Sequence, residues 1–156
     1  MKQTTVIGID PGGSGGFGII RIMDEAMAIS AMKMPETEKD ISDLIGTLKR
    51  PNTSAYIEKV NSMPGQGISS AWKFSGNCHG LRMAMVCHGI PFEEVRPQVW
   101  QKGLAIPKRK KTESQTQFKN RLKAKAQQLF PDIQVTHAIG DALLLAEYGR
   151  RVRGAT

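Results

Sequence analysis

Two carboxylates stand where apolar segments end, and they are the first residues that could do chemistry. Asp10 follows the apolar residues 6–9 and precedes a Pro-Gly-Gly turn, and Glu58 ends a second apolar segment, residues 54–58. A charge at the end of a central strand is costly unless it is compensated, and a metal ion is a common compensation. If the two strands pair in parallel, both acids project at the same edge of the sheet.

A histidine and a third acid open the last apolar helix. His137 and Asp141 lie four residues apart at the start of a helix predicted over residues 137–150, so their side chains share one helix face. An imidazole and a carboxylate on one face form a reasonable half-site for a divalent cation. A structural interpretation explains this segment, taken alone, at least as well. In it the helix dipole stabilises the charge of Asp141, and His137 is a partly buried neighbour.

Ordinary structural explanations also exist for the first two acids. Asp10 is a typical turn residue before Pro-Gly, and Glu58 could pair with Lys59 at a strand end. The repetition of one pattern, an apolar strand that delivers an acid at its carboxyl end, favours a shared site.

The elements that must position these residues follow from periodicity and turn residues. A hairpin over residues 6–20 turns on glycines, a third strand is possible at 27–34, and Pro35 ends it. The remaining predicted elements are a helix at 37–49, a strand at 54–58, a long helix at 69–89, a strand at 90–95, and helices at 98–104, 113–130 and 137–150. In the long helix, the residues expected to pack are Trp72, Leu81, Met85 and Val86.

A zinc site shared by Cys78-His79 and Cys87-His88 is not expected. The two pairs are nine residues apart, and nine residues of helix rise about 13 Å, much more than a single tetrahedral site can span.

Length and charge limit the functions to consider. The 156 residues are expected to form one domain, residues 1–156, and the net charge of +8 favours a polyanionic partner, nucleic acid first. No apolar run approaches the roughly 20 residues that span a bilayer, and the N-terminal residues lack a signal-peptide pattern, so a cytoplasmic protein with no membrane partner is expected.

The positive charges concentrate in one loop. Lys108, Arg109, Lys110 and Lys111 form the densest basic run, and phosphate contact is the favoured interpretation. The helix that follows carries four more cations that form either a phosphate-contacting stripe or a solvated face: Lys119, Arg121, Lys123 and Lys125. Further candidates for DNA contact are Met63 and Gln66, in the loop that follows Glu58, and Lys73 and Lys102, in the two helices predicted after it.

Several motifs in order resemble one family. The segment IGIDPG, a strand ending in Glu58 and a last helix containing DALLLA resemble the RuvC family of Holliday junction resolvases, in the RNase H-like (retroviral integrase) superfamily. The resemblance extends over nearly the whole chain. The segments MPGQGISSAWKFSGNCHGLRMAM, RPQVWQK and HAIGDALLLAEYG resemble phage-borne members, which implies a phage-encoded protein that acts in a bacterial host.

The resemblance implies a fold, an activity and a ligand set. It implies an α/β protein of RNase H-like fold, a five-stranded mixed sheet flanked by helices, acting as a homodimeric crossover junction endodeoxyribonuclease without a small-molecule cofactor. By motif position, Asp10 would bridge two Mg²⁺ ions, Glu58 would bind one, and Asp141 with His137 would bind the other; Mn²⁺ is expected to substitute. Many relatives carry a second acid three residues before the last one, where this chain has Ala138, with His137 one position earlier. Paired nicks in four-way or other branched DNA would follow.

Two other functions were weighed. A non-catalytic branched-DNA-binding module of the same fold would bind without metal-dependent cleavage, and the presence of Asp10, Glu58 and Asp141 argues against it. An actin-like ATPase also begins with a strand, an acid and a glycine turn, but it needs two such domains, for which 156 residues are too few.

Overall fold

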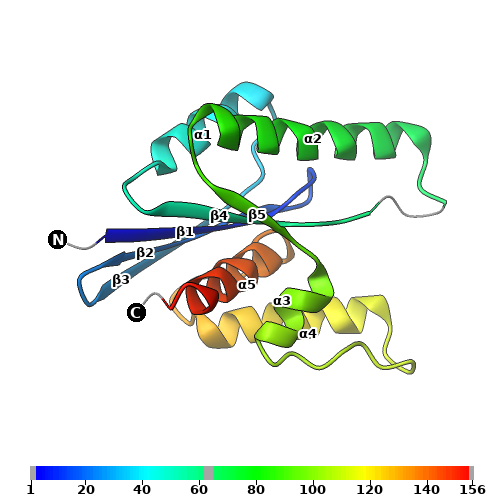
Figure 1. Cartoon of the computed structure of the whole chain (residues 1–156). Helices are drawn as coiled ribbons and strands as arrows, with labels where there is room; N and C mark the ends of the chain where they lie inside the picture. The colour runs from blue at the N-terminus through cyan, green and yellow to red at the C-terminus, as the bar shows by residue number, and fades with distance from the viewer. Residues whose placement is uncertain (1–2, 62–64, 155–156) are drawn as a thin grey trace.

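A five-stranded mixed sheet forms the centre of the computed structural model, which describes residues 3–61 and 65–154 (Figure 1). The strands lie in the order β3-β2-β1-β4-β5. Neighbours β3, β2 and β1 pair antiparallel, and β1, β4 and β5 pair in parallel. Their bounds are β1 Gln3–Asp10, β2 Gly16–Met23, β3 Ala26–Lys33, β4 Thr53–Glu58 and β5 Phe92–Val95.

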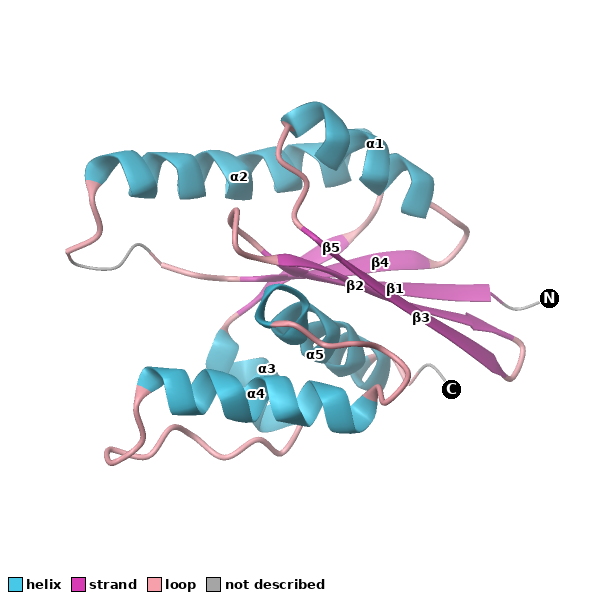
Figure 2. Ribbon diagram, turned by 180° about the vertical axis from the view of Figure 1, so that it is seen from behind, coloured by secondary structure: helices cyan, strands magenta, loops and turns pink. Residues whose placement is uncertain are grey.

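Helices cover both faces of this sheet. Helices α1 (Glu38–Leu48) and α2 (Ile68–Cys87) lie on one face, and the helices α3 (Pro97–Gly103), α4 (Gln115–Leu129) and α5 (His137–Val152) lie on the other (Figures 1 and 2). The alternation of side chains along β1 explains the two layers, because Val6 joins the core under α5 while Ile7 and Ile9 join the core under α1 and α2.

Two glycines bring α5 directly onto the sheet. A Cβ at Gly8 would lie 2.1 Å from the carbonyl oxygen of Ala142, and one at Gly18 would lie 2.7 Å from the same oxygen. No side chain fits at either position, so the backbone of α5 packs against the centre of β1 and β2. This contact fixes the level at which Asp141, the residue before Ala142, stands relative to the end of β1.

The predicted elements are all present, with small changes in their bounds. The prediction that Trp72 and Val86 pack is wrong, since they are 81% and 65% exposed, whereas Leu81 and Met85 are buried as expected. Helix α2 covers the sheet with one narrow face, and the other face is left to solvent. Thr136 is the N-cap residue of α5, but its side chain makes no capping hydrogen bond.

Across the described part of the chain, no helix is both long enough and apolar enough to cross a membrane.

Candidate active site

Asp10 and Glu58 meet at one edge of the sheet, as predicted from the sequence. Asp10 ends β1 and Glu58 ends β4, and the parallel register pairs Ile9 with Ile57, the residue before each acid. Both carboxylates therefore leave the sheet at neighbouring positions on the same side of the molecule.

A cleft of about 710 Å³ opens at this edge and is lined from both helical layers. The lining includes Asp10, Glu58, His137 and Asp141, so the four residues singled out in the sequence come together. Helix α2 adds Ser70, Lys73 and Phe74, helix α4 adds Lys119 and Lys123, and Gln66 comes from the loop before α2. The cleft thus combines acids from two strand ends and α5 with cations from α2 and α4.

The glycine turn after Asp10 is held by α2. The backbone N–H of Gly12 donates a 2.8 Å hydrogen bond to Oδ1 of Asn77. Gly12 has a φ of 100°, a conformation that favours glycine, and a Cβ there would lie 3.1 Å from the ring of Phe74. Asn77 and Phe74 therefore fix the turn that determines where Asp10 points.

The pKa values of all three carboxyl groups are raised, first by burial. Burial, followed by the charges of Glu58 and Asp141, raises the pKa of Asp10 from 3.8 to about 8. Burial and the charge of Asp141 raise the pKa of Glu58 from 4.5 to about 7, and burial also raises the pKa of Asp141. Lys119 opposes all three shifts, because its positive charge favours the ionised form of each acid.

A residue of α3, on the face of the sheet opposite to α2, orients Glu58. The indole Nε1–H of Trp100, on α3, donates a 2.8 Å hydrogen bond to Oε2 of Glu58. Trp100 is fully buried, so its ring is fixed by the core packed around it. This contact lowers the pKa of Glu58 and partly offsets the effect of burial.

The chemistry of the donor set fits a hard divalent cation. Oxygen ligands suit Mg²⁺, and a cation would compensate the burial and the neighbouring negative charges that raise the pKa of Asp10 and Glu58. Within residues 3–61 and 65–154, no three His, Cys, Asp or Glu side chains converge closely enough, as they stand, to hold a metal ion. The carboxylates share a cleft without forming a closed coordination shell.

The predicted DNA-contacting residues divide by location. Gln66 and Lys73 line the cleft, whereas Lys102 is exposed on α3 and the run from Lys108 to Lys111 is exposed in the loop between α3 and α4. Met63 lies outside the described residues. The four cations of α4 are not one stripe, because Lys119 and Lys123 face the cleft while Arg121 pairs with Glu113.

Four residues of the site were not assigned to it from the sequence: Lys119, Lys123, Trp100 and Asn77. Lys119 and Lys123 are spaced i, i+4, which places them on one helix face. That spacing is the only feature of the sequence that groups the two lysines. It does not predict which part of the protein their helix face packs against. For Trp100 and Asn77 there is no local signal.

The fold has close parallels among solved structures, although no protein-family model matches the chain and no curated protein matches it. The chain is similar to Thermus thermophilus RuvC in complex with a Holliday junction substrate, with 17% identity and a TM-score of 0.63, covering 98% of this chain and 97% of that one. It is also similar to a second T. thermophilus RuvC structure, with 17% identity and a TM-score of 0.62, covering 96% and 97%. The likeness is one of fold, and it confirms the predicted RNase H-like, RuvC-like architecture.

Proposed function

We propose that this chain is a metal-dependent endonuclease that cuts four-way or otherwise branched DNA. The observation that carries the proposal is the meeting of Asp10, Glu58 and Asp141 in one cleft that Lys119 and Lys123 also line. The fold supports it, because the chain aligns along 98% of its length with a RuvC structure bound to a Holliday junction substrate.

The carboxylates would hold the metal. Asp10, Glu58 and Asp141, with His137 as a fourth ligand, would hold two Mg²⁺ ions. Two such ions, when bound, activate the attacking water and stabilise the leaving oxygen of a phosphodiester. Mn²⁺ should substitute, because an imidazole suits it better than it suits Mg²⁺.

The remaining residues bind and orient the substrate. Lys119 and Lys123 attract the phosphate to the cleft, and Gln66 and Lys73 contact the DNA backbone there. Trp100 holds Glu58 in one orientation through the 2.8 Å hydrogen bond. The lysines also counter the negative charge that the carboxylates would otherwise present to the DNA.

A homodimer is part of the proposal, because paired nicks in a four-way junction need two sites. Helix α2 offers the surface: Ile68, Trp72, Met83 and Val86 are exposed by 88%, 81%, 63% and 65%. At about 100° per residue these four side chains fall within roughly 60° of one another on the helix. Two copies of this face packed around a two-fold axis would cover it.

The phage-borne character and action in the bacterial cytoplasm also belong to the proposal, and they rest on the sequence segments that resemble phage members of the family.

The experiment compares cleavage with binding. Labelled four-way junction, flap, fork and linear duplex are incubated with Mg²⁺, Mn²⁺ or EDTA, using the wild type, Asp10→Asn and the matched control Asp43→Asn on the exposed face of α1. We expect metal-dependent nicking of the junction by the wild type and the control, and binding without nicking by Asp10→Asn. Junction binding by the wild type without metal-dependent nicking would indicate the non-catalytic module instead.

A further inference from the structure

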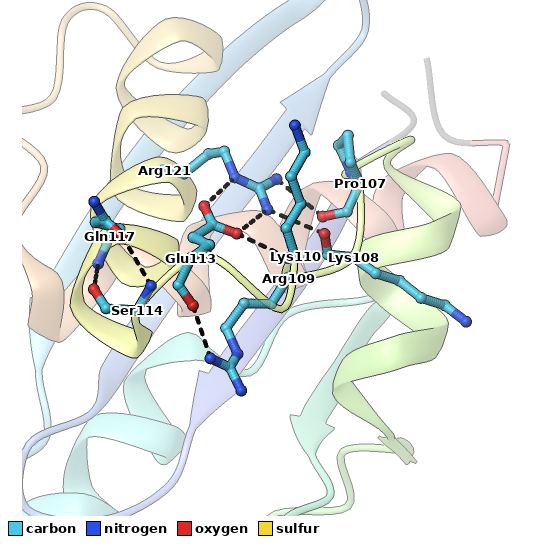
Figure 3. Close-up of polar contacts among 8 residues, drawn as sticks. All are labelled: Pro107, Lys108, Arg109, Lys110, Glu113, Ser114, Gln117 and Arg121. Atoms are coloured by element: carbon cyan, nitrogen blue, oxygen red, sulfur yellow. Dashed lines mark hydrogen bonds and ion pairs between the residues drawn. The ribbon is translucent and has the colours of Figure 1, made fainter.

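One ion pair closes the basic loop between α3 and α4 (Figure 3). Nε and Nη2 of Arg121 donate to the two carboxylate oxygens of Glu113 at 2.9 Å and 3.0 Å. The same guanidinium donates through Nη1 to the carbonyl oxygen of Pro107 at 2.9 Å and through Nη2 to that of Lys108 at 3.4 Å. Arg121 thus joins both ends of the loop to helix α4.

Glu113 makes the complementary contacts from the end of the loop. Its carboxylate accepts a 3.3 Å hydrogen bond from the backbone N–H of Lys110, and its carbonyl oxygen accepts a 2.8 Å hydrogen bond from Nη1 of Arg109. Its own N–H donates to the carbonyl oxygen of Lys110 at 3.1 Å. The side chain of Glu113 is only 16% exposed, although it lies at the surface.

These contacts divide the cations into two groups. Arg121 uses Nε, Nη1 and Nη2 on protein groups, and Arg109 uses Nη1 on the carbonyl oxygen of Glu113, so both guanidinium groups are held against the loop. The side chains of Lys108 and Lys110 extend away from the loop into solvent (Figure 3), and Lys111 is also exposed. Three lysines are therefore presented outward on a loop whose backbone is tied down at several points.

Helix α4 connects the loop to the cleft. Arg121 lies on α4 between Lys119 and Lys123, which line the cleft, and residues two apart on a helix point to different sides. A capping box between Ser114 and Gln117 fixes the first turn of the same helix. Helix α4 therefore holds the exposed lysines at a set position relative to the carboxylates.

We propose that Glu113 and Arg121 are positioning residues, which hold Lys108, Lys110 and Lys111 in a preorganised phosphate-binding loop in register with the cleft. This inference rests on the proposed function, since it takes branched DNA as the polyanion that the loop meets. The lysines make the contacts, and the ion pair removes the entropy cost of ordering them at the moment of binding.

The sign of the effect of Glu113 separates this role from a simple surface charge. An acid that only lies near the lysines would repel phosphate, so its removal would strengthen binding to DNA. An acid that shapes the loop has the opposite effect, because its removal leaves the lysines to be ordered by the DNA itself. The two accounts predict opposite changes from the same substitution.

Binding is measured in an Asp10→Asn background with a labelled four-way junction across a range of salt concentrations. We expect Glu113→Ala to weaken binding about three- to tenfold at every salt concentration with an unchanged salt slope, and Glu113→Gln, which keeps an acceptor for Arg121, to weaken it less. Lys110→Ala should instead flatten the slope by about one unit, because a phosphate contact is lost. The matched control Asp132→Asn, an exposed acid beyond the other end of α4, should bind as tightly as the parent or more tightly. Binding by Glu113→Ala as tight as that of the parent, or tighter, overturns the proposal.

Limited trypsin digestion of the free protein tests the same loop without DNA. Cleavage after residues 108–111 should be several times faster in Glu113→Ala and in Arg121→Gln than in the parent, while far-UV circular dichroism stays unchanged. Equal cleavage rates in all three proteins overturn the anchoring of the loop. If the parent binds junctions no better than linear duplex, the proposed selectivity for branched DNA fails, whereas the positioning role fails only if Glu113→Ala binds the DNA as tightly as the parent or more tightly.

Discussion

The indole N–H of Trp100 donates a 2.8 Å hydrogen bond to Oε2 of Glu58, and it links the buried core to a carboxylate of the cleft. Trp100 is on α3, on the opposite face of the sheet from α2, and none of its surface is exposed. If Glu58 holds a metal ion, as proposed, this contact is expected to matter for activity although Trp100 does not line the cleft, because groups behind a metal ligand fix its orientation and basicity.

Replacement of Trp100 by Phe should lower the rate of junction nicking about tenfold to a hundredfold while the affinity for junction DNA changes little. A Phe ring keeps most of the buried apolar volume but cannot donate to Glu58, whose pKa should rise further. Single-turnover nicking and binding titrations test this, and Tyr148→Phe, at a partly buried ring of α5 that does not line the cleft, is the matched control. A normal nicking rate in Trp100→Phe would assign the hydrogen bond to stability alone.

Metal-free protein should lose stability as the pH rises from about 4 to about 8. The folded-state pKa values of Asp10 and Glu58, about 8 and about 7, lie above their ordinary values of 3.8 and 4.5. The folded state therefore binds more protons than the unfolded state between these values, and its free energy of unfolding falls as the pH rises through them. Below the ordinary values both states are protonated and the penalty is absent.

Urea unfolding in EDTA across this pH range measures the effect, which should be on the order of a few kcal/mol. Asp10→Asn should flatten the curve, and Mg²⁺ should stabilise the wild type more at the alkaline end than at the acid end. A stability of the metal-free wild type that does not change with pH would contradict the burial and the close approach of the acids.

Replacement of Lys119 by Gln should slow nicking about tenfold or more and move the acid limb of the pH–rate profile to higher pH. Lys119 favours the ionised forms of Asp10, Glu58 and Asp141, so its removal raises the pKa of each acid. The matched control is Lys125→Gln, which removes a positive charge from the same helix at a residue that does not line the cleft. It should leave the acid limb of the pH–rate profile at the pH of the wild type. If both variants shift the acid limb by the same amount, the shift comes from the net charge of the protein and not from the position of Lys119.

His137 stands one residue before the position at which many members of the resembled family carry an acid, and its role as a ligand stays a prediction. If it binds metal, His137→Asp should keep substantial nicking activity, and His137→Ala should lose about tenfold or more. Mn²⁺ should support the wild type at least as well as Mg²⁺ does. Nicking rates of the three proteins across concentrations of each metal decide the matter. Equal losses in the Asp and Ala variants would indicate a structural histidine.

Substitution of Trp72 by Glu should convert the proposed dimer into a monomer. Trp72 is 81% exposed on the apolar face of α2, and a charge there would have to be buried against a second copy. Sedimentation velocity measures the assembly, and a plasmid that extrudes a cruciform distinguishes paired cuts, which linearise it, from single nicks. A wild type that sediments as a monomer at all concentrations would rule out this interface.

Local patterns were enough to predict the elements and the acids. The apolar strands that end on Asp10 and Glu58 stand out because alternation, burial and a terminal charge are all local properties of a strand. The spacing of His137 and Asp141 likewise follows from helix geometry alone. Parallel pairing of β1 and β4 then makes the two strand ends neighbours.

Tertiary packing decided what surrounds those acids. Lys119 and Arg121 are two residues apart in a single basic helix, yet one faces the cleft and the other holds the loop through Glu113. Their roles depend on how α4 packs against α5. Sequence periodicity cannot predict this packing, because it shows which residues share a helix face but not which element that face contacts. The same reason explains why Trp100 could not be assigned to Glu58, 42 residues away, and why Trp72 was wrongly placed in the core.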